Sequence, residues 1–260
     1  MQSSIQLKPN PQVQQVQYLL RIGDSCLFLS QRLCEWCGHA PMLEEDIAMA
    51  NMALDLLGQA RAVFTRAGQL SGQGFDEDQL ALLRDERDYV NPTLFELPRG
   101  DFAFTVLRNA MASTLMKLLW ERLRESNDAE LSAIAGKAIK EARYHQVHAA
   151  DWVVRLGDGT VESRRRCEEA LAQLWLYTPE LFESDPIDEA AEHTGLGPSW
   201  SALREPWLAE MAEILAEATL AIPKESAFRS TGKRGIHSEH MGYLLADMQY
   251  LQRAFPGGAW

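Results

Sequence analysis

The amino-acid sequence predicts an all-α protein in which four long helices form an antiparallel bundle and additional shorter helices follow near the C-terminus. Three observations predict this fold class. Ala, Leu, Glu, Gln and Arg dominate the chain, and Val and Ile never gather into the alternating runs typical of strands. Four helical stretches of about 25 residues each are joined by mostly short connections, as in a bundle. No repeat, linker or low-complexity segment divides residues 1–260, so we expect one domain, with residues 1–11 as a flexible N-terminus.

The first two long helices are predicted from the residues at their ends. The first is expected from about Pro11 to Gly38, because Gly38 and the following Pro41 are typical of a helix end. The second is expected from near Leu43 to the Gly-rich segment 71–74, and the helix dipole stabilises three acidic residues in its first turn. This helix carries an apolar stripe with spacings of three and four, which consists of Ile47, Ala50, Leu54, Leu57, Ala60 and Phe64.

The remaining helices follow in order along the chain. Residues 76–91 are expected to form a short polar helix, and residues 91–100 a loop. The third long helix is expected at about 101–126, and the fourth from the capping cluster 126–128 to about Leu156. The third helix has apolar residues facing inward, namely Val106, Ala110, Leu115, Leu118 and Leu119. Three shorter helices are expected near residues 161–182, 198–221 and 235–254.

Composition and charge exclude several classes of protein. With 46% hydrophobic and 24% charged residues, the chain has the balance of a folded globular protein. A net charge of −12 argues against nucleic-acid binding, because phosphate contacts need clustered cations. No membrane protein is expected, since no window approaches the roughly 18 apolar residues of a span, and the polar segment 1–17 lacks a secretory signal. The four cysteines form no disulfide framework, so we expect a cytoplasmic protein.

Four long helices with inward-facing acidic residues raise the question of a carboxylate-bridged di-iron site. Such a site takes a Glu from each of two helices and a Glu-x-x-His pair from each of the other two. The residues three positions before the six histidines are Trp36, Ala142, His145, Ala190, Arg234 and His237. None of them is Glu or Asp, so the Glu-x-x-His pair is absent and no complete metal site is expected in this chain.

Polar residues nevertheless share one face on each of three helices. Two interpretations are open: a residual metal or proton-relay site, or a polar network that keeps the helix register through hydrogen bonds and ion pairs with Arg21, Arg32 or Arg61. We favour the network, because buried charges persist only when they are paired. The residues are Glu141, His145, His148 and Trp152 on the fourth helix, Asp24, Gln31 and Glu35 on the first, and Asn51, Asp55 and Gln59 on the second.

Two short motifs have both a functional and a structural interpretation. Cys34-Glu-Trp-Cys37 has the spacing of a redox motif, but it lies on a helix without a βαβ context, so packing of two small side chains is the expected role. His237-Ser-Glu-His240 lacks the second Cys or His pair of a zinc site. We expect a helix N-terminus there, which together with Lys233 and Arg234 is suited to hold a phosphate or a partner's carboxylate.

Several runs of residues are long and specific enough to indicate a family. They are Arg21-Ile-Gly-Asp-Ser, Leu29-Ser-Gln-Arg-Leu, Glu35-Trp-Cys-Gly-His-Ala-Pro41, Leu54-Asp-Leu-Leu-Gly-Gln-Ala-Arg61, Arg84-Asp-Glu-Arg87, Lys137-Ala-Ile-Lys-Glu-Ala-Arg-Tyr-His145, Gly235-Ile-His-Ser-Glu-His240 and Met248-Gln-Tyr-Leu-Gln-Arg253. Through these runs the chain resembles, from about Tyr18 to Trp260, the C-subunit family of the phenylacetyl-CoA 1,2-epoxidase complex.

The resemblance implies a ferritin-like fold and a bacterial multicomponent mono-oxygenase of aerobic phenylacetate degradation. That enzyme inserts one oxygen atom from O2 into the aromatic ring of phenylacetyl-CoA. In this family a related A subunit carries the di-iron centre, whereas the C subunit lacks the metal ligands and scaffolds the A subunit. A small B subunit and a reductase with flavin, an iron–sulfur cluster and NADPH complete the system. The resemblance therefore implies a subunit that is not itself catalytic and that holds no cofactor of its own.

The resemblance also implies contact with the acyl-CoA. By position, the residues expected near the ligand are Asp88, Tyr89, Val90 and Asn91, and, at a helix start, Glu189, Ala190 and Ala191. The alternative is that both segments are solvated loops and that the partner subunit holds the CoA phosphates.

Three functions are thus open. The first is the structural subunit, and seven Trp and nine Met exceed what one bundle core requires, so some are expected to anchor an interface. The second is a ferritin-like binding or storage protein outside aromatic catabolism. The third is a self-sufficient ferritin-like di-iron enzyme with unusual ligands, which would use Asp24, Glu35, Asp55, Glu141, His145 and His148.

Overall fold

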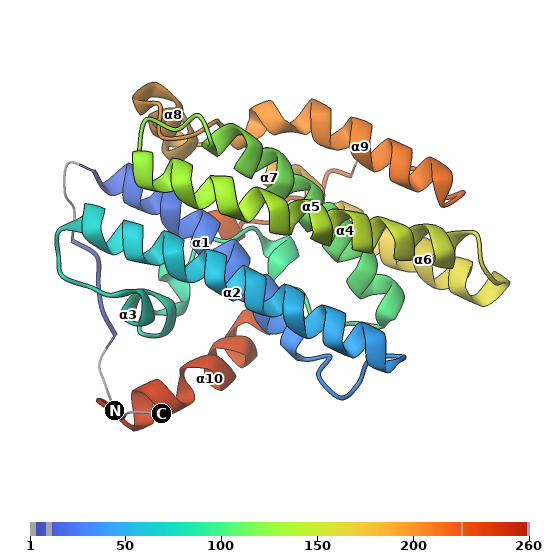
Figure 1. The fold of residues 1–260 in the computed structure, drawn as a ribbon, viewed down its shortest axis with the longest axis horizontal. Helices are drawn as coiled ribbons and strands as arrows, with labels where there is room; N and C mark the ends of the chain where they lie inside the picture. Colours follow the sequence, from blue (N-terminus) through green and yellow to red (C-terminus); the bar gives the residue numbers. More distant parts are fainter. Residues whose placement is uncertain (1–3, 9–11, 225, 259–260) are drawn as a thin grey trace.

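The computed structural model describes residues 4–8, 12–224 and 226–258 and confirms the predicted ferritin-like bundle. These residues form helices and no β-strand. The four long helices lie side by side, with α1 packed along α2 and α4 along α5 (Figure 1). Their bounds are Val13–Cys34 for α1, Leu43–Ser71 for α2, Phe102–Leu123 for α4 and Ala129–Gly157 for α5.

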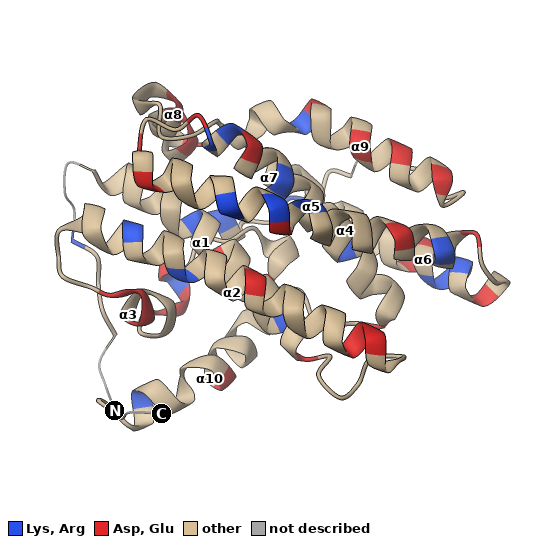
Figure 2. Cartoon of the chain, in the orientation of Figure 1, with Lys and Arg blue, Asp and Glu red and all other residues tan. Residues whose placement is uncertain are grey.

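The ends of the long helices follow from local chemistry. The acidic residues at 44–46 gather at the N-terminal end of α2, where the dipole is positive (Figure 2). Gly72 adopts a left-handed φ of 64° just past the other end of α2. Asp101 and Asp128 cap α4 and α5, because each side chain accepts hydrogen bonds from backbone N–H groups of the first turn.

The shorter helices surround the bundle. They are α3 (Glu77–Leu82), α6 (Val161–Leu174), α7 (Thr178–Leu181), α8 (Pro186–Thr194), α9 (Arg204–Glu217) and α10 (Glu239–Ala254). Single turns of 3-10 helix lie at Glu86–Asp88, Thr93–Phe95, Trp175–Tyr177, Trp200–Leu203 and Gly232–Arg234. None of the described helices is both long enough and apolar enough to cross a membrane.

The helix expected over residues 76–91 is wrong beyond Leu82. The Arg84 side chain turns inward and pairs with Asp24 on α1, and the backbone N–H of Val90 donates to the same carboxylate at 2.9 Å. At Tyr89 the backbone is extended, with φ of −85° and ψ of 143°. Two buried polar contacts to another helix therefore outweigh the local helical preference of this segment.

The core lies around α4, which is buried on nearly all sides. The five residues expected to face inward on this helix, Val106, Ala110, Leu115, Leu118 and Leu119, are all buried, which confirms the prediction. Trp120, Trp200 and Trp207 are the largest side chains that are fully buried in the core. Burying such side chains is the main source of folding free energy in a helical domain.

The apolar stripe expected on α2 is divided between the core and the surface. Ala60 and Phe64 are buried, but Ile47 and Leu54 expose 54% and 65% of their surface, and Leu57 is exposed as well. Other residues of the same helix face the core instead, namely Met49, Met52, Ala53, Leu56 and Val63. Helix α2 thus has two apolar sides, of which the fold of this chain covers one.

Described residues near both ends of the sequence pack close to α3. Helix α10 packs Met241, Leu244 and Leu245 against Phe28 of α1 and against Tyr89. Residues 1–11 are expected to be flexible; of these, 1–3 and 9–11 lie outside the described residues. In the described part, the Ile5 N–H donates to the Leu83 carbonyl at 2.9 Å.

Candidate functional site

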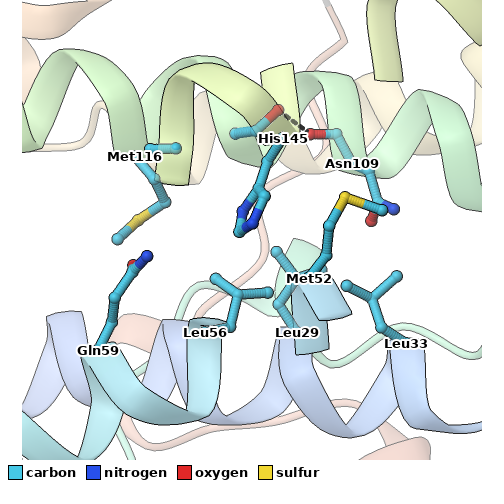
Figure 3. A pocket seen from close by; sticks show the side chains of 10 residues that line it. Leu29, Leu33, Met52, Leu56, Gln59, Asn109, Met116 and His145 are labelled. Atoms are coloured by element: carbon cyan, nitrogen blue, oxygen red, sulfur yellow. Dashed lines mark hydrogen bonds between the residues drawn. The ribbon is translucent and has the colours of Figure 1, made fainter. Parts of the chain in front are cut away.

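The centre of the four-helix bundle is filled by side chains from all four helices. Figure 3 shows Leu29 and Leu33 of α1, Met52 and Leu56 of α2, and Met116 of α4 pointing toward one another around His145 of α5. The space left between them is about 10 Å³. This is at the lower limit of what one water molecule occupies, so apolar atoms take the place where bundle metal sites are normally built.

Polar residues join the helices beside this apolar centre. Gln59 of α2 accepts a hydrogen bond from the Trp120 indole N–H of α4 at 3.2 Å and donates to Glu141 of α5 at 3.0 Å. His145 of α5 lies 3.0 Å from the Asp55 carboxylate of α2. One turn further along α5, His148 Nε2 lies 3.0 Å from Glu45 Oε2, although the two are not oriented for a hydrogen bond. The interhelical polar network favoured from the sequence is therefore present along the α2–α5 contact.

The buried imidazole in this network is neutral near pH 7. Burial lowers the pKa of His145, and the hydrogen bond and charge of Asp55 only partly offset that effect. Because an ionised carboxylate only accepts hydrogen bonds, Nε2 of His145 carries the ring proton and donates a hydrogen bond to Asp55. The pair holds α5 against α2 without burying a full positive charge.

The six residues of the self-sufficient di-iron hypothesis do not converge on one point. Asp24 pairs with Arg84, Glu35 pairs with Arg32 as the sequence suggested, and Glu141 accepts from Gln59. In the described ranges, no group of three or more His, Cys, Asp or Glu side chains is arranged to hold a metal ion. The donor set therefore does not fit a dinuclear cluster, because Asp24, Glu35 and Glu141 bond to other residues and the six side chains do not converge.

Among the ion pairs made by the six candidate ligands, the Asp24–Arg84 pair is the most deeply buried. The side chain of Arg84 also stacks over the Tyr89 ring, with its guanidinium carbon 4.2 Å from the ring centroid. Burial raises the pKa of the Asp24 carboxyl, and the charge and hydrogen bonds of Arg84 and the Val90 N–H offset this only in part. For Arg84, burial lowers the pKa, but the charge of Asp24 outweighs it and leaves the pKa raised. The pair fixes segment 84–90 against α1.

The outward sides of α2 and α5 form an exposed apolar surface, which we call the α2–α5 face. It lies beside the His145–Asp55 contact, and the Tyr144 ring is 6.2 Å from that of His145. The α2–α5 face consists of Leu43, Ile47 and Leu54 of α2 and Tyr144 and Val147 of α5, all of which are exposed. Several large apolar side chains exposed on neighbouring helices are typical of an interaction site. The spacing of apolar residues on α2 already indicated an apolar side. The sequence predicted a single apolar stripe, however, whereas α2 has one apolar side in the core and another on the surface.

At its other end, the α2–α5 face continues into a shallow groove of about 290 Å³. Small residues line it, among them Gly58 and Ala62 of α2 and Ala133 and Ala138 of α5. A Cβ atom at Gly58 would meet nothing within 4 Å, so packing within this chain does not require a glycine there. Apolar side chains therefore project from one end of the face, and a groove receives side chains at the other.

Segment 88–91, expected near acyl-CoA, is largely enclosed by the chain itself. Tyr89, Val90 and Asn91 are buried, and Asp88 is half-buried. The Tyr89 hydroxyl donates to the Ala81 carbonyl at 2.8 Å and accepts from the amide of Gln249 on α10 at 2.9 Å. Contact of these residues with acyl-CoA stays a prediction, and Asp88 is the member nearest to the surface.

Segment 189–191 lies in α8, which the structure attaches to α1. Asp185 caps this helix, and both Asp185 and Asp188 pair with the buried Arg21 of α1. Glu189 is exposed, Ala190 is half-buried and Ala191 is buried. Contact of these residues with acyl-CoA also stays a prediction.

The helix N-terminus expected near residues 237–240 is present, but a residue of the chain itself occupies it. Glu96 accepts a hydrogen bond from the Ser238 N–H at 2.6 Å, and its other oxygen lies 2.6 Å from His237 Nδ1. His237 Nε2 faces the Tyr89 carbonyl at 3.0 Å. Lys233 is buried and donates to Asp188 at 3.2 Å. The expectation of an external phosphate or partner carboxylate at this point is therefore wrong.

The surroundings of His237 favour the charged form of its imidazole. Burial lowers the pKa of His237, but the hydrogen bond and charge of Glu96 outweigh burial and leave the pKa raised. Both ring nitrogens face acceptors, as an imidazolium requires. This ion pair fastens the start of α10 to the segment that precedes α4.

The cysteine motif differs from its expected role. Cys34 and Cys37 are both exposed at the end of α1, so the packing interpretation is wrong for them. Cys26 and Cys167 are buried.

Comparison with known proteins agrees with the resemblance seen in the sequence. The C subunit of the 1,2-phenylacetyl-CoA epoxidase of Escherichia coli (strain K12) is 51% identical over 243 residues, which cover 94% of this chain and 98% of that protein. A family model described as phenylacetic acid catabolic protein matches residues 1–260. The chain therefore belongs to the family of phenylacetic acid catabolic proteins.

Proposed function

We propose that this chain is a structural, non-catalytic subunit of a phenylacetyl-CoA 1,2-epoxidase complex, in which it binds and orients the di-iron A subunit. The single observation that carries this proposal is the 51% identity to the C subunit of the E. coli epoxidase over nearly the full length of both chains. The complex would act in aerobic phenylacetate degradation, with NADPH as the source of electrons.

The filled bundle centre supports a role without a metal of its own. Leu29, Leu56 and Met116 occupy the space between the four helices, and the polar side chains around them pair with one another. A subunit that has the helical bundle of a di-iron oxygenase but an apolar centre would act through contacts with its partner. The partner would supply the di-iron centre, and a reductase would supply the flavin and the iron–sulfur cluster.

The α2–α5 face supports a large helix–helix interface with the A subunit. Leu43, Ile47 and Leu54 lie one or two turns apart along α2, and Tyr144 and Val147 lie beside them on α5. Obligate interfaces have an apolar centre of this kind and bury about 2,000 Å² or more. Exposed apolar residues at regular helical spacing gain free energy when a partner helix covers them.

Charge along the α2–α5 face supports a partner of the same fold in the opposite orientation. Exposed Glu44 and Asp151 flank the end with projecting apolar side chains, and exposed Lys137 and Lys140 flank the groove end. If the partner has the same arrangement, a half-turn places each acidic end on a basic end and each set of apolar side chains over a groove. Isologous contacts between related subunits have this self-complementary geometry.

The proposal includes the small B subunit, the reductase and phenylacetyl-CoA as further partners. For acyl-CoA, the side chain of Glu189 is exposed and those of Asp88 and Ala190 are half-buried, so these three can be reached from solvent within the two segments expected near the ligand. Tyr89 and Asn91 would act on a ligand by holding the backbone of segment 88–91 in place.

Co-expression of this chain with the A subunit tests the proposal. We expect the two to elute together in size-exclusion chromatography, with iron in the A subunit and with phenylacetyl-CoA turnover, once B subunit and reductase are added, only when this chain is present. A monodisperse monomer without affinity for the A subunit would overturn the proposal. Unchanged turnover in the absence of this chain would do the same.

A further inference from the structure

Two exposed thiols lie where α1 ends and the connection to α2 begins. Cys34 is the last residue of α1, and Cys37 follows three positions later in that connection, residues 35–42. Both side chains are exposed, whereas Cys26 and Cys167 expose 0% of their surface. Figure 1 shows the connection as a blue loop at one end of the bundle. The chain therefore presents a pair of thiols that small molecules can reach.

The backbone of this turn places the two cysteine side chains one above the other. The Cys37 N–H donates to the Cys34 carbonyl at 3.0 Å, and the Trp36 N–H donates to the Leu33 carbonyl at 3.0 Å. Hydrogen bonds between residues three apart are those of a 3-10 helix, in which the side chains at positions i and i+3 eclipse each other. The end Cα atoms of such a turn lie less than about 7 Å apart, and disulfides span about 4.4–6.8 Å between Cα atoms. The turn therefore suits an S–S bond between Cys34 and Cys37.

The two residues between the cysteines are anchored to the rest of the protein. The Trp36 ring is buried against Phe102, with the ring centroids 5.8 Å apart, and its indole N–H donates to the Thr105 hydroxyl at 2.9 Å. The Arg99 side chain donates to the Glu35 carbonyl at 2.6 Å. An anchored turn holds the thiols in one arrangement before they react, which reduces the entropy lost when they join.

We propose that Cys34 and Cys37 form a reversible disulfide, with a small-molecule disulfide of the glutathione class as the oxidant. The Cys37 thiolate attacks one sulfur of the oxidant and releases one thiol. The Cys34 sulfur then attacks Cys37 in the mixed disulfide and releases the second thiol. One S–S bond forms in the protein and one breaks in the oxidant, and the two protons of the protein thiols end on the released thiols.

The surroundings of each cysteine favour this order and confine the reaction to the exposed pair. Burial and the charge of Cys37 raise the pKa of Cys34, so Cys37 is the better first nucleophile. Burial also raises the pKa of Cys26, and it raises that of Cys167 to about 11. These two thiols are protonated and out of reach, and they serve as internal controls. The reaction needs no other chain, so it stands or falls independently of the proposed function.

Peptide mapping of the full chain tests the proposal. The native chain is equilibrated in glutathione buffers and quenched with acid, and its remaining thiols are blocked with iodoacetamide in urea. Trypsin leaves Cys34 and Cys37 together in peptide 33–61, whereas Cys26 and Cys167 fall in other peptides. We expect peptide 33–61 to carry no iodoacetamide and to be about 2 Da lighter than the dithiol, and dithiothreitol should reverse this change. Cys26 and Cys167 should be fully alkylated, as free thiols are.

Three variants show whether the two thiols react with each other. Cys34→Ser and Cys37→Ser each keep one exposed thiol, which can only retain glutathione as a mixed disulfide. A second thiol in the same turn has an effective concentration of mM or more. At about 0.1 mM reduced glutathione, the unaltered pair should therefore need about tenfold less oxidised glutathione for half conversion than either variant. Cys167→Ala is the matched control, because it removes a buried thiol and should leave oxidation of the pair unchanged.

Two results would overturn the proposal. One is a peptide 33–61 that carries two glutathione or two iodoacetamide groups at every glutathione ratio. The other is a disulfide that forms only in urea, where Cys26 and Cys167 react as well. Both results are read in the unaltered chain, so they decide the question even if a variant does not fold.

Discussion

The Asp24–Arg84 pair allows a quantitative test of what holds segment 84–90 against α1. Both side chains are buried, with exposures of 0% and 1%. In Arg84→Met, Asp24 keeps the Val90 N–H as a donor but loses its counter-charge. Removing one member of a buried pair costs about 3–5 kcal/mol, a large part of the 5–15 kcal/mol by which domains are stable. At about 2–4 °C per kcal/mol, we expect the Tm to fall by roughly 6–20 °C.

The assay is urea unfolding followed by far-UV circular dichroism, with the double variant Asp24→Asn/Arg84→Met as the control. Asparagine still accepts from the Val90 N–H but carries no charge, so the double variant should recover more than half of the lost free energy of unfolding. The deficit of Arg84→Met should also shrink as the pH falls, because burial raises the pKa of Asp24 and a protonated carboxyl buries no charge. A loss below about 1 kcal/mol in the single variant, or no recovery in the double variant, would refute this reasoning.

Three further predictions concern the face, its groove and the attachment of α10. Leu54 is 65% exposed, and full burial of a leucine contributes about 1.5–3 kcal/mol, so Leu54→Ser should cost about 1–2 kcal/mol of A-subunit binding, roughly a 5–30-fold higher Kd. Val161→Ser, at an exposed site on α6, should leave the Kd measured by calorimetry unchanged. Gly58→Ala should stabilise the isolated chain against urea by about 0.5–1 kcal/mol, because alanine favours a helix more than glycine does and its methyl group meets nothing in this chain. The same methyl group enters the groove, so binding to the A subunit should weaken. An unaltered Kd would contradict docking in the groove. The pKa of His237 is raised in the folded chain, so its stabilising effect is complete below the unfolded value near 6.5 and is lost as the pH rises through the folded value. Urea titrations at several pH values should show this decline in the unaltered chain and not in His237→Gln, and parallel curves would count against it.

The fold was predictable because long helices depend on signals that are local in sequence. The start of α4 at Asp101, the cap at Asp128, the acidic first turn of α2 and the inward residues of α4 all lie where the sequence predicts. Segment 84–91 was not predictable in this way. Its conformation depends on Asp24, about 60 residues earlier in the chain, and helical periodicity contains no information on such a partner.

The candidate site was predictable in its polar part and not in its apolar part. Shared faces on α2 and α5 indicated that Asp55, Gln59, Glu141 and His145 interact, and the structure brings them into contact. The α2–α5 face escaped prediction because the same apolar spacing describes a residue that faces the core and one that faces a partner. Leu54 and Leu56 are close in sequence and equally apolar, yet Leu54 is exposed and Leu56 is buried. The packing of α1, α4 and α5 against α2 decides which of the two is buried.

The attachment of α10 to Glu96 and Arg84 has a consequence for how the chain is made. The hydrogen bonds from His237 to Glu96 and from Gln249 to the Arg84 carbonyl span 141 and 165 residues. At synthesis rates of about 5–20 residues per second, the ribosome needs roughly 10–30 s between producing the acceptor and the donor of either bond. During that interval the Glu96 carboxylate lacks its contact with His237, and the Tyr89 ring lacks the apolar residues of α10 that pack against it. The nascent polypeptide can therefore close this end of the molecule only after α10 has been synthesised, and a product that stops before α10 leaves Glu96 and Tyr89 without these contacts.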